Sequence, residues 1–102
     1  MEKAQISRSS SVTISATSTQ ACAKVMGGFK RVQLIITNTS AAAVATLAKG
    51  LNAAVAGYGI RLPPNAAYLE SSDNGFQCWQ DEIQVIGDAA GTVAVVETLI
   101  ED

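Results

Sequence analysis

The side chains that most enzymes use for nucleophilic and acid–base chemistry are scarce in this chain. It contains no histidine, which removes Ser–His and Cys–His pairs and the commonest metal ligand in proteins. Its two cysteines, Cys22 and Cys78, are 56 residues apart and lack the close spacing of a structural zinc site. We therefore predict that the chain is not an enzyme, has no catalytic residue, and holds no metal or other cofactor.

Carboxylates are the remaining acid–base candidates, because two of them suffice for glycoside hydrolysis. Asp81 and Glu82 are adjacent, and Asp88 follows them closely. We expect these residues at the start of a strand and at the tip of a hairpin, where a solvated charge is ordinary. A carboxylate-based hydrolase therefore stays only as an alternative.

The two cysteines are also too few for a disulfide framework. We expect both to be buried free thiols, which behave as small apolar side chains. A disulfide between Cys22 and Cys78 is the alternative.

Trp79 is the only tryptophan. Its ordinary role is packing in the core, with the indole N–H bonded to a carbonyl group. If the ring points outward beside Phe76 or Tyr58, these aromatic residues become the best candidate anchor of an interface, because a few aromatic side chains commonly dominate binding energy. Together with Tyr68 they would also offer a stacking surface for a glycan.

The charges are divided unequally along the chain. Residues 1–61 hold all seven basic residues and one acid, a net charge of +6, whereas residues 62–102 hold eight acids and no base, a net charge of −8. We expect the halves to neutralise each other across neighbouring strands of one fold. The alternative is that the basic half meets the acidic face of a neighbouring subunit. The overall charge of −2 predicts no nucleic-acid partner.

The length of 102 residues allows one domain with a thin core, and such domains are often completed by oligomerisation. The first twenty residues lack the apolar region of a secretory signal, and the longest apolar stretch is too short to span a bilayer. We therefore expect a soluble protein that is made in the cytoplasm and does not contact a membrane.

Most of the chain alternates between apolar and polar residues, with turn residues between the alternating segments. This pattern predicts an all-β fold, an antiparallel β-sandwich or jelly-roll-like domain of about eight short strands over residues 12–102. The polar residues 1–11 predict a flexible N-terminal arm, with an edge segment that is ordered only by contact with something else as the alternative. Residues 43–48 are interpreted as a strand followed by a loop, with a helix over 41–56 as the alternative. Residues 63–65 (Pro-Pro-Asn) predict a tight turn.

Three stretches carry a resemblance to a known group of proteins: FKRVQLIITNTS (29–40), GYGIRLPPNAAYLE (57–70) and DEIQVIGDAAGTVAVVE (81–97). Their order resembles small virion proteins of tailed bacteriophages that are encoded among head genes. The resemblance covers about two-thirds of the chain, and its motifs are structural. Asn65 stands where glycine is usual after the two prolines, and residues 41–48 are richer in alanine than that strand usually is.

The resemblance implies a β-sandwich that decorates or cements a bacteriophage capsid, with the major capsid protein as partner and the capsid surface of the virion as location. A homo-oligomer is expected, and a trimer suits the local three-fold positions that such proteins commonly occupy. The expected contacts with the capsid or with other subunits are basic: Lys3, Arg8, Lys24, Lys30 and Arg31. A tail or fibre module that binds a receptor or glycan through Trp79, Phe76 and Tyr58 is the alternative.

Overall fold

The described residues form eight antiparallel strands. The structure is a computed structural model that describes residues 4–50, 54–55, 57–73 and 76–102. The strands are β1 (Gln5–Ile14), β2 (Thr19–Cys22), β3 (Phe29–Asn38), β4 (Ala45–Lys49), β5 (Ile60–Leu62), β6 (Ala67–Ser71), β7 (Ile83–Gly87) and β8 (Gly91–Glu101). The described residues include no helix, and thus none that could cross a membrane. The predicted all-β fold is confirmed.

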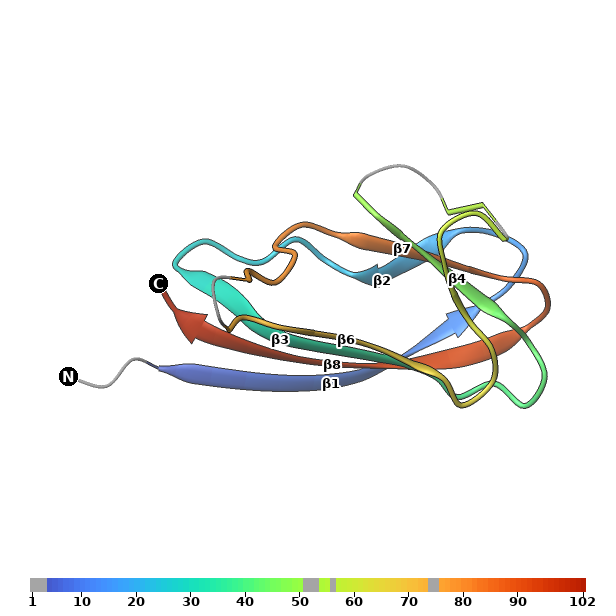
Figure 1. Ribbon diagram of the computed structural model, residues 1–102, viewed down its shortest axis with the longest axis horizontal. Helices are drawn as coiled ribbons and strands as arrows, with labels where there is room; N and C mark the ends of the chain where they lie inside the picture. The colour runs from blue at the N-terminus through green and yellow to red at the C-terminus, as the bar shows by residue number, and fades with distance from the viewer. Residues whose placement is uncertain (1–3, 51–53, 56, 74–75) are drawn as a thin grey trace.

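The strands form two layers that face each other (Figure 1). Sheet A has the order β1-β8-β3-β6 and sheet B the order β2-β7-β4-β5. The start of β1 and the end of β8 lie at the same end of an elongated molecule of 47 × 24 × 23 Å. Strands that pair with each other in sheet A are far apart in the sequence. This sheet is therefore held together by hydrogen bonds between distant parts of the chain.

Alternation places the apolar side chains of both sheets in the space between them. Leu34 and Ile36 of β3 and Val95 of β8 are buried on the inner face of sheet A. Leu47 of β4 and Val85 of β7 belong to the same buried cluster from sheet B. This part of the core follows the period of two from which the fold was predicted.

The expected flexible arm over residues 1–11 is corrected by the structure. Residues 5–14 form β1, which pairs with β8 along its whole length, from Gln5 opposite Ile100 to Ile14 opposite Gly91. The prediction was wrong because it took alternating apolar side chains as the sign of a strand. An edge strand is held by backbone hydrogen bonds and tolerates exposed serines on both faces. The domain therefore has no boundary at residue 11.

Two local predictions are confirmed. Residues 45–49 form a strand, β4, in place of the alternative helix; the loop expected after it falls partly outside the described residues. In the turn, the N–H of Ala66 donates to the carbonyl oxygen of Pro63 at 3.0 Å. Asn65 has a φ of 69°, a left-handed conformation that asparagine tolerates better than most residues.

Asn38 ties together the connections at the end of β3. The side chain is fully buried, and its amide nitrogen donates to the carbonyl oxygens of Ala43 (2.8 Å) and Leu62 (2.7 Å). Its side-chain oxygen accepts the N–H of Ser40 at 2.9 Å. These three bonds fix the start of the β3–β4 connection and the end of β5 to one side chain.

We expect Asn38→Ala to lower the free energy of unfolding by about 2–4 kcal/mol, because two carbonyls and one N–H would lose their partner in a buried site. Urea unfolding followed by circular dichroism measures this. The neighbouring exposed Thr39→Ala is the control, with an expected loss below about 1 kcal/mol. Equal losses in the two variants would contradict the role of Asn38.

Candidate functional site

The buried side chain of Arg31 joins three parts of the fold. It is 0% exposed, and its guanidinium donates to the carboxylate of Glu97 on β8 at 2.9 Å. It also donates to the carbonyl oxygen of Ala23 (2.9 Å), after β2, and to that of Trp79, before β7. Because a guanidinium carries five N–H donors in a fixed fork, one side chain can bind all these acceptors. Arg31 thus connects sheet A with the two segments that lead into and out of sheet B.

A β-bulge turns Arg31 inward. In the pairing of β3 with β8, Arg31 lies opposite Leu99 and Gln33 lies opposite Thr98, so Val32 is an extra residue. One extra residue reverses which side chains face the core. Without it, simple alternation back from Leu34 would direct Arg31 to solvent.

The segment 76–82 has no strand of its own. Its backbone is held mainly by side chains, besides one backbone bond from the N–H of Val25 to the carbonyl oxygen of Gln80 at 3.0 Å. The N–H of Trp79 donates to the Glu70 carboxylate at 2.8 Å, and that of Cys78 to the Ser72 hydroxyl at 3.0 Å. These bonds take the place of the backbone hydrogen bonds that a neighbouring strand would make.

The side chain of Gln80 completes this attachment. Its amide nitrogen donates to the carbonyl oxygens of Arg31 (2.8 Å) and Cys78 (2.7 Å), and its oxygen accepts the N–H of Arg31 at 2.7 Å. Gln80 therefore pairs with the backbone of β3 as a neighbouring strand would.

A second charged group lies beside this network. Glu70 of β6 is 5% exposed, pairs with Lys49 of β4 and accepts the hydroxyl of Tyr68. The Lys49 nitrogen is 5.5 Å from the centre of the Tyr68 ring and 5.6 Å from that of Trp79, distances at which a cation is attracted to a ring face. Because β6 belongs to sheet A and β4 to sheet B, this ion pair links the layers.

The pKa values of the pair reflect its bonding. Burial by itself would raise the pKa of Glu70, but the bonds from Lys49, the Trp79 N–H and Tyr68 together hold it below its ordinary value. Burial by itself would lower the pKa of Lys49, but its bonds to Glu70 and Tyr68 raise it. Both groups are therefore charged at neutral pH.

The segment 76–81 forms one wall of a cavity of about 470 Å³, which we call the Trp79 pocket. It is lined by Lys24, Lys49, Phe76, Gln77, Cys78, Trp79, Gln80 and Asp81. Two of its lining residues are aromatic, and several of the others end in groups that form hydrogen bonds. A concave, mostly apolar surface with a few polar groups is typical of ligand sites.

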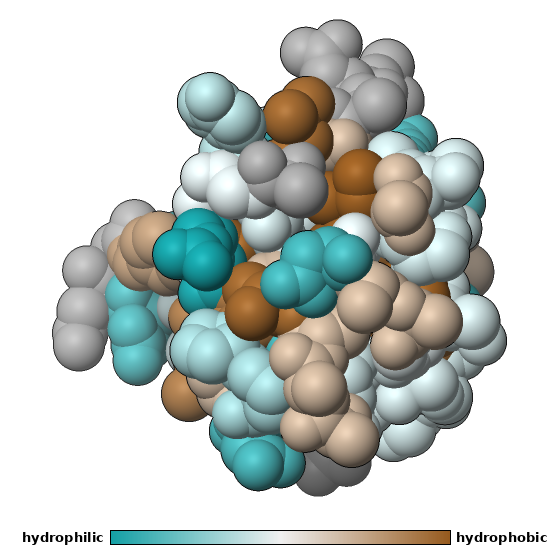
Figure 2. All heavy atoms as spheres, turned by 90° about the vertical axis from the view of Figure 1, so that its right-hand side faces the viewer, coloured by the Kyte–Doolittle hydropathy of each residue, from teal (hydrophilic) through white to brown (hydrophobic). Residues whose placement is uncertain are grey.

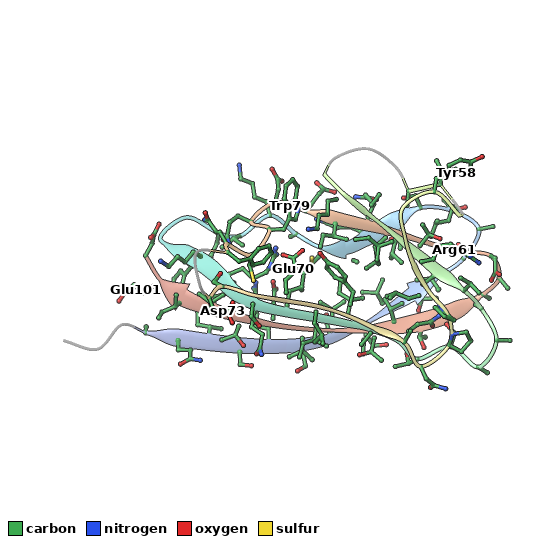
Figure 3. The ribbon with its side chains drawn as sticks, viewed as in Figure 1. Tyr58, Arg61, Glu70, Asp73, Trp79 and Glu101 are labelled. Carbon is green, nitrogen blue, oxygen red and sulfur yellow. The ribbon has the colours of Figure 1, made fainter. Side chains whose placement is uncertain are left out.

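The aromatic residues singled out from the sequence do not form one cluster. Trp79 packs against the core, and its indole N–H donates to the carbonyl oxygen of Glu82 at 3.0 Å, which confirms its ordinary role. Phe76 is 52% exposed and lines the Trp79 pocket. Tyr58 is 78% exposed and lies well away from Trp79 along the molecule (Figure 3).

The proposed set of basic contacts is also divided. Arg31 is wrong as a surface contact, because it is buried among carbonyl groups. Arg8 pairs with Glu97 at 2.8 Å, although half of its side chain is exposed. Lys24 and Lys30 are exposed, and Lys3 lies outside the described residues.

The opposite charges of the two halves of the chain meet inside the fold. Among the described residues, the ion pairs are Arg8–Glu97, Arg31–Glu97 and Lys49–Glu70. Each joins a base from residues 1–61 to an acid from residues 62–102. The predicted neutralisation within one fold is confirmed for these groups.

Sheet A has a second surface of interest, its outer face. Three adjacent rows of side chains point away from sheet B, as the strand registers show. The rows are Ser7–Thr98–Gln33–Ser71, Ser9–Val96–Ile35–Leu69 and Ser11–Ala94–Thr37–Ala67. We call these twelve residues, none of which is charged, the neutral face. Leu69 is 65% exposed on it, and Lys30, in the next row opposite Ile100, stands at its border.

The end of the molecule with the β7–β8 hairpin presents no comparable surface. In Figure 2, which views this end, hydrophilic and hydrophobic groups are interspersed among residues of intermediate hydropathy. Asp88 of the hairpin accepts the backbone N–H of Val44 at 2.8 Å. The carboxylate of Asp88 therefore stabilises the contact between the hairpin and the segment before β4.

Both cysteines are free and buried, as predicted. Burial raises the pKa of Cys22 to about 11, and burial also raises the pKa of Cys78. The thiolate is the reactive form. At neutral pH both side chains are therefore protonated and of low reactivity.

The structure resembles solved structures, whereas no protein-family model and no curated protein matches the chain. A chain from the work titled "Bacillus endospore appendages form a novel family of disulfide-linked pili" has a TM-score of 0.62 and 13% identity, over 98% of this chain and 88% of that one. Tobacco streak virus coat protein has a TM-score of 0.48 and 11% identity, over 98% of this chain and 87% of that one. The first likeness shows the fold.

We expect Arg31→Met to lower the free energy of unfolding by about 3–5 kcal/mol, because buried acceptors would lose a charged donor. Arg31→Lys keeps the charge but not the fork and should also destabilise. The exposed neighbour Lys30→Met is the control, with a change within about 0.5 kcal/mol. Urea unfolding measures all three, and a stable Arg31→Met variant would contradict the role assigned to Arg31.

Stability should fall in acid through Glu70. Because its pKa is lower in the folded protein than its ordinary value of 4.5, its contribution is complete above that value and is lost as the pH drops through the lowered pKa. Near pH 6, Glu70→Gln should be about 2 kcal/mol less stable than the wild type. This difference should shrink toward pH 2.

Unfolding in urea at a series of pH values measures this difference. Asp73→Asn, at an exposed carboxylate (Figure 3), is the control and should follow the wild type. A difference between Glu70→Gln and the wild type that does not change with pH would show that the charge of Glu70 has no such effect.

Proposed function

We propose that this chain is a structural protein of a bacteriophage virion, a capsid decoration (cement) protein that acts by binding and not by turnover. The neutral face carries the proposal. An uncharged sheet surface with Val96, Ile35 and Leu69 in its central row suits contact with a large partner surface. The partner we propose is the outer surface of the capsid, built by the major capsid protein.

The distribution of charge supports binding through this face. Ion pairs within the fold neutralise Arg8, Arg31, Lys49 and their two acidic partners. A partner that covers the neutral face would bury no charge of this chain, and burying unpaired charge is the costly part of forming an interface. Lys30, which is exposed in the next row, remains for contacts at the border of the neutral face.

The fold supports a structural role in a more general way. The chain from the Bacillus endospore appendage, which is described as a disulfide-linked pilus, has a similar fold over 98% of this chain. That protein is part of an assembly. The buried, protonated thiols of Cys22 and Cys78 do not suit such linkage here. The assembly that we propose is therefore non-covalent.

The size of the neutral face favours a homo-oligomer. Four strands and three rows of outward side chains cover about 400 Å² in projection, less than the roughly 800 Å² that each partner buries in a stable interface. Several copies joined in one oligomer bind a shell more tightly than one copy does. We propose a trimer, the oligomer suited to three-fold positions.

The test uses capsid shells that lack the protein. The wild type should bind them and raise the temperature at which they melt, because it binds the assembled state. Ser9→Lys and Leu69→Lys, which add a charge at two ends of the central row, should weaken binding by about tenfold to a hundredfold. Co-sedimentation and scanning calorimetry measure both effects.

Ala16→Lys is the matched control, because it adds the same charge in the exposed β1–β2 connection. It should bind shells as the wild type does. A wild type that neither binds nor stabilises shells would disprove the decoration role. Binding that survives both lysines on the neutral face would disprove the assigned face.

A further inference from the structure

The Trp79 pocket is built differently from the rest of the surface. Its wall is an irregular segment, 76–81, whose backbone is held by Arg31 and Glu70, two of the most buried charged side chains. Anchoring an irregular segment in this way costs more than continuing a strand, because charged groups must be buried. The anchoring holds Phe76, Gln77 and Trp79 in place around a cavity.

We propose that the Trp79 pocket binds a neutral pyranose ring of a saccharide. The aromatic side chains supply the first reason. Phe76 is 52% exposed although it is a large apolar side chain, and Trp79 lines the same cavity. The C–H groups on one face of a sugar ring pack against the electron-rich face of an aromatic ring, which carries the negative part of its quadrupole.

The polar groups of the lining supply the second reason. Lys24 and Gln77 are exposed at the pocket and can donate to sugar hydroxyls. Asp81 accepts the N–H of Glu82 with one oxygen at 2.9 Å, and a carboxylate has further acceptor sites. Donors and acceptors therefore lie around an apolar surface, as a ring that bears hydroxyl groups requires.

The charge of the lining argues for a neutral sugar. The charge of Lys49 is already paired with Glu70. Lys24 and Asp81 then contribute one positive and one negative charge, so the pocket has no net charge to attract an acidic ligand. An acidic sugar would also meet Asp81.

The site does not rest on the proposed function. The pocket is lined by residues after β2, on β4 and before β7, all strands of sheet B, whereas the neutral face is the outer side of sheet A. Figure 3 shows Trp79 on the side of the molecule away from the outer face of sheet A. A copy bound to a shell through the neutral face would leave the pocket open to solvent.

The single tryptophan makes the test direct. Because Trp79 is the only tryptophan, its fluorescence reports on the pocket. We expect neutral hexoses or their short oligomers to change this emission in a saturable way, with dissociation constants in the millimolar range, on the order of 1–10 mM. Glucuronic acid should bind more weakly than glucose.

Phe76→Ala should weaken binding about tenfold, and Tyr58→Ala, which removes a more exposed aromatic ring far from the pocket, should leave it unchanged. The proposal fails if no neutral saccharide gives a saturable change up to about 50 mM. It also fails if both variants lose binding equally, or if the acidic sugar binds more tightly. Loss of shell binding in Phe76→Ala, without any saccharide binding by the wild type, would make the pocket a protein contact instead.

Discussion

The buried guanidinium of Arg31 is the interaction on which this sandwich depends. Removing a charge from water costs several kcal/mol, and the cost is recovered only when the charge is paired and each of its polar atoms is hydrogen-bonded. Arg31 meets this condition with a carboxylate from β8 and carbonyl groups from the segments beside β2 and β7. Its burial therefore requires three parts of the chain to be in place together, which makes the end of the molecule where β1 starts and β8 ends cooperative with the rest.

Sheet A reverses the usual arrangement of its two faces over part of its length. An ordinary half-exposed sheet is apolar inside and charged outside. Here Glu70, Glu97 and Arg31 lie on the inner face, whereas the outer face carries Val96, Ile35 and Leu69. The ionic groups stabilise the interior through bonds to the backbone and to each other, and an uncharged surface is left on the outside. The same division of charge thus explains both how the layers are joined and why one face carries no charged side chain.

The sequence predicts the parts of the fold that follow from local rules. The period of two revealed the strands, and Pro64 followed by Asn65 predicted the turn that the structure contains. The role of Arg31 could not be predicted in this way. It depends on the extra residue Val32, and a bulge leaves no signal in the alternation of a single sequence. The residues next to an arginine in the sequence do not show whether its side chain is exposed or buried.

The candidate sites also differ in how much of each can be predicted from the sequence. Phe76 and Trp79 were recognisable as aromatic residues close in sequence, but Lys49 and Glu70 come together only through the crossing of two sheets. The neutral face could have been found from the alternate positions of 7–11, 33–37, 67–71 and 94–98, which hold no charged residue. Recognising it as one surface requires the order β1-β8-β3-β6, because none of these four strands follows its neighbour directly in sequence. Pairing between distant strands creates the face, and burial of the charged groups on the opposite side of the same strands keeps it neutral.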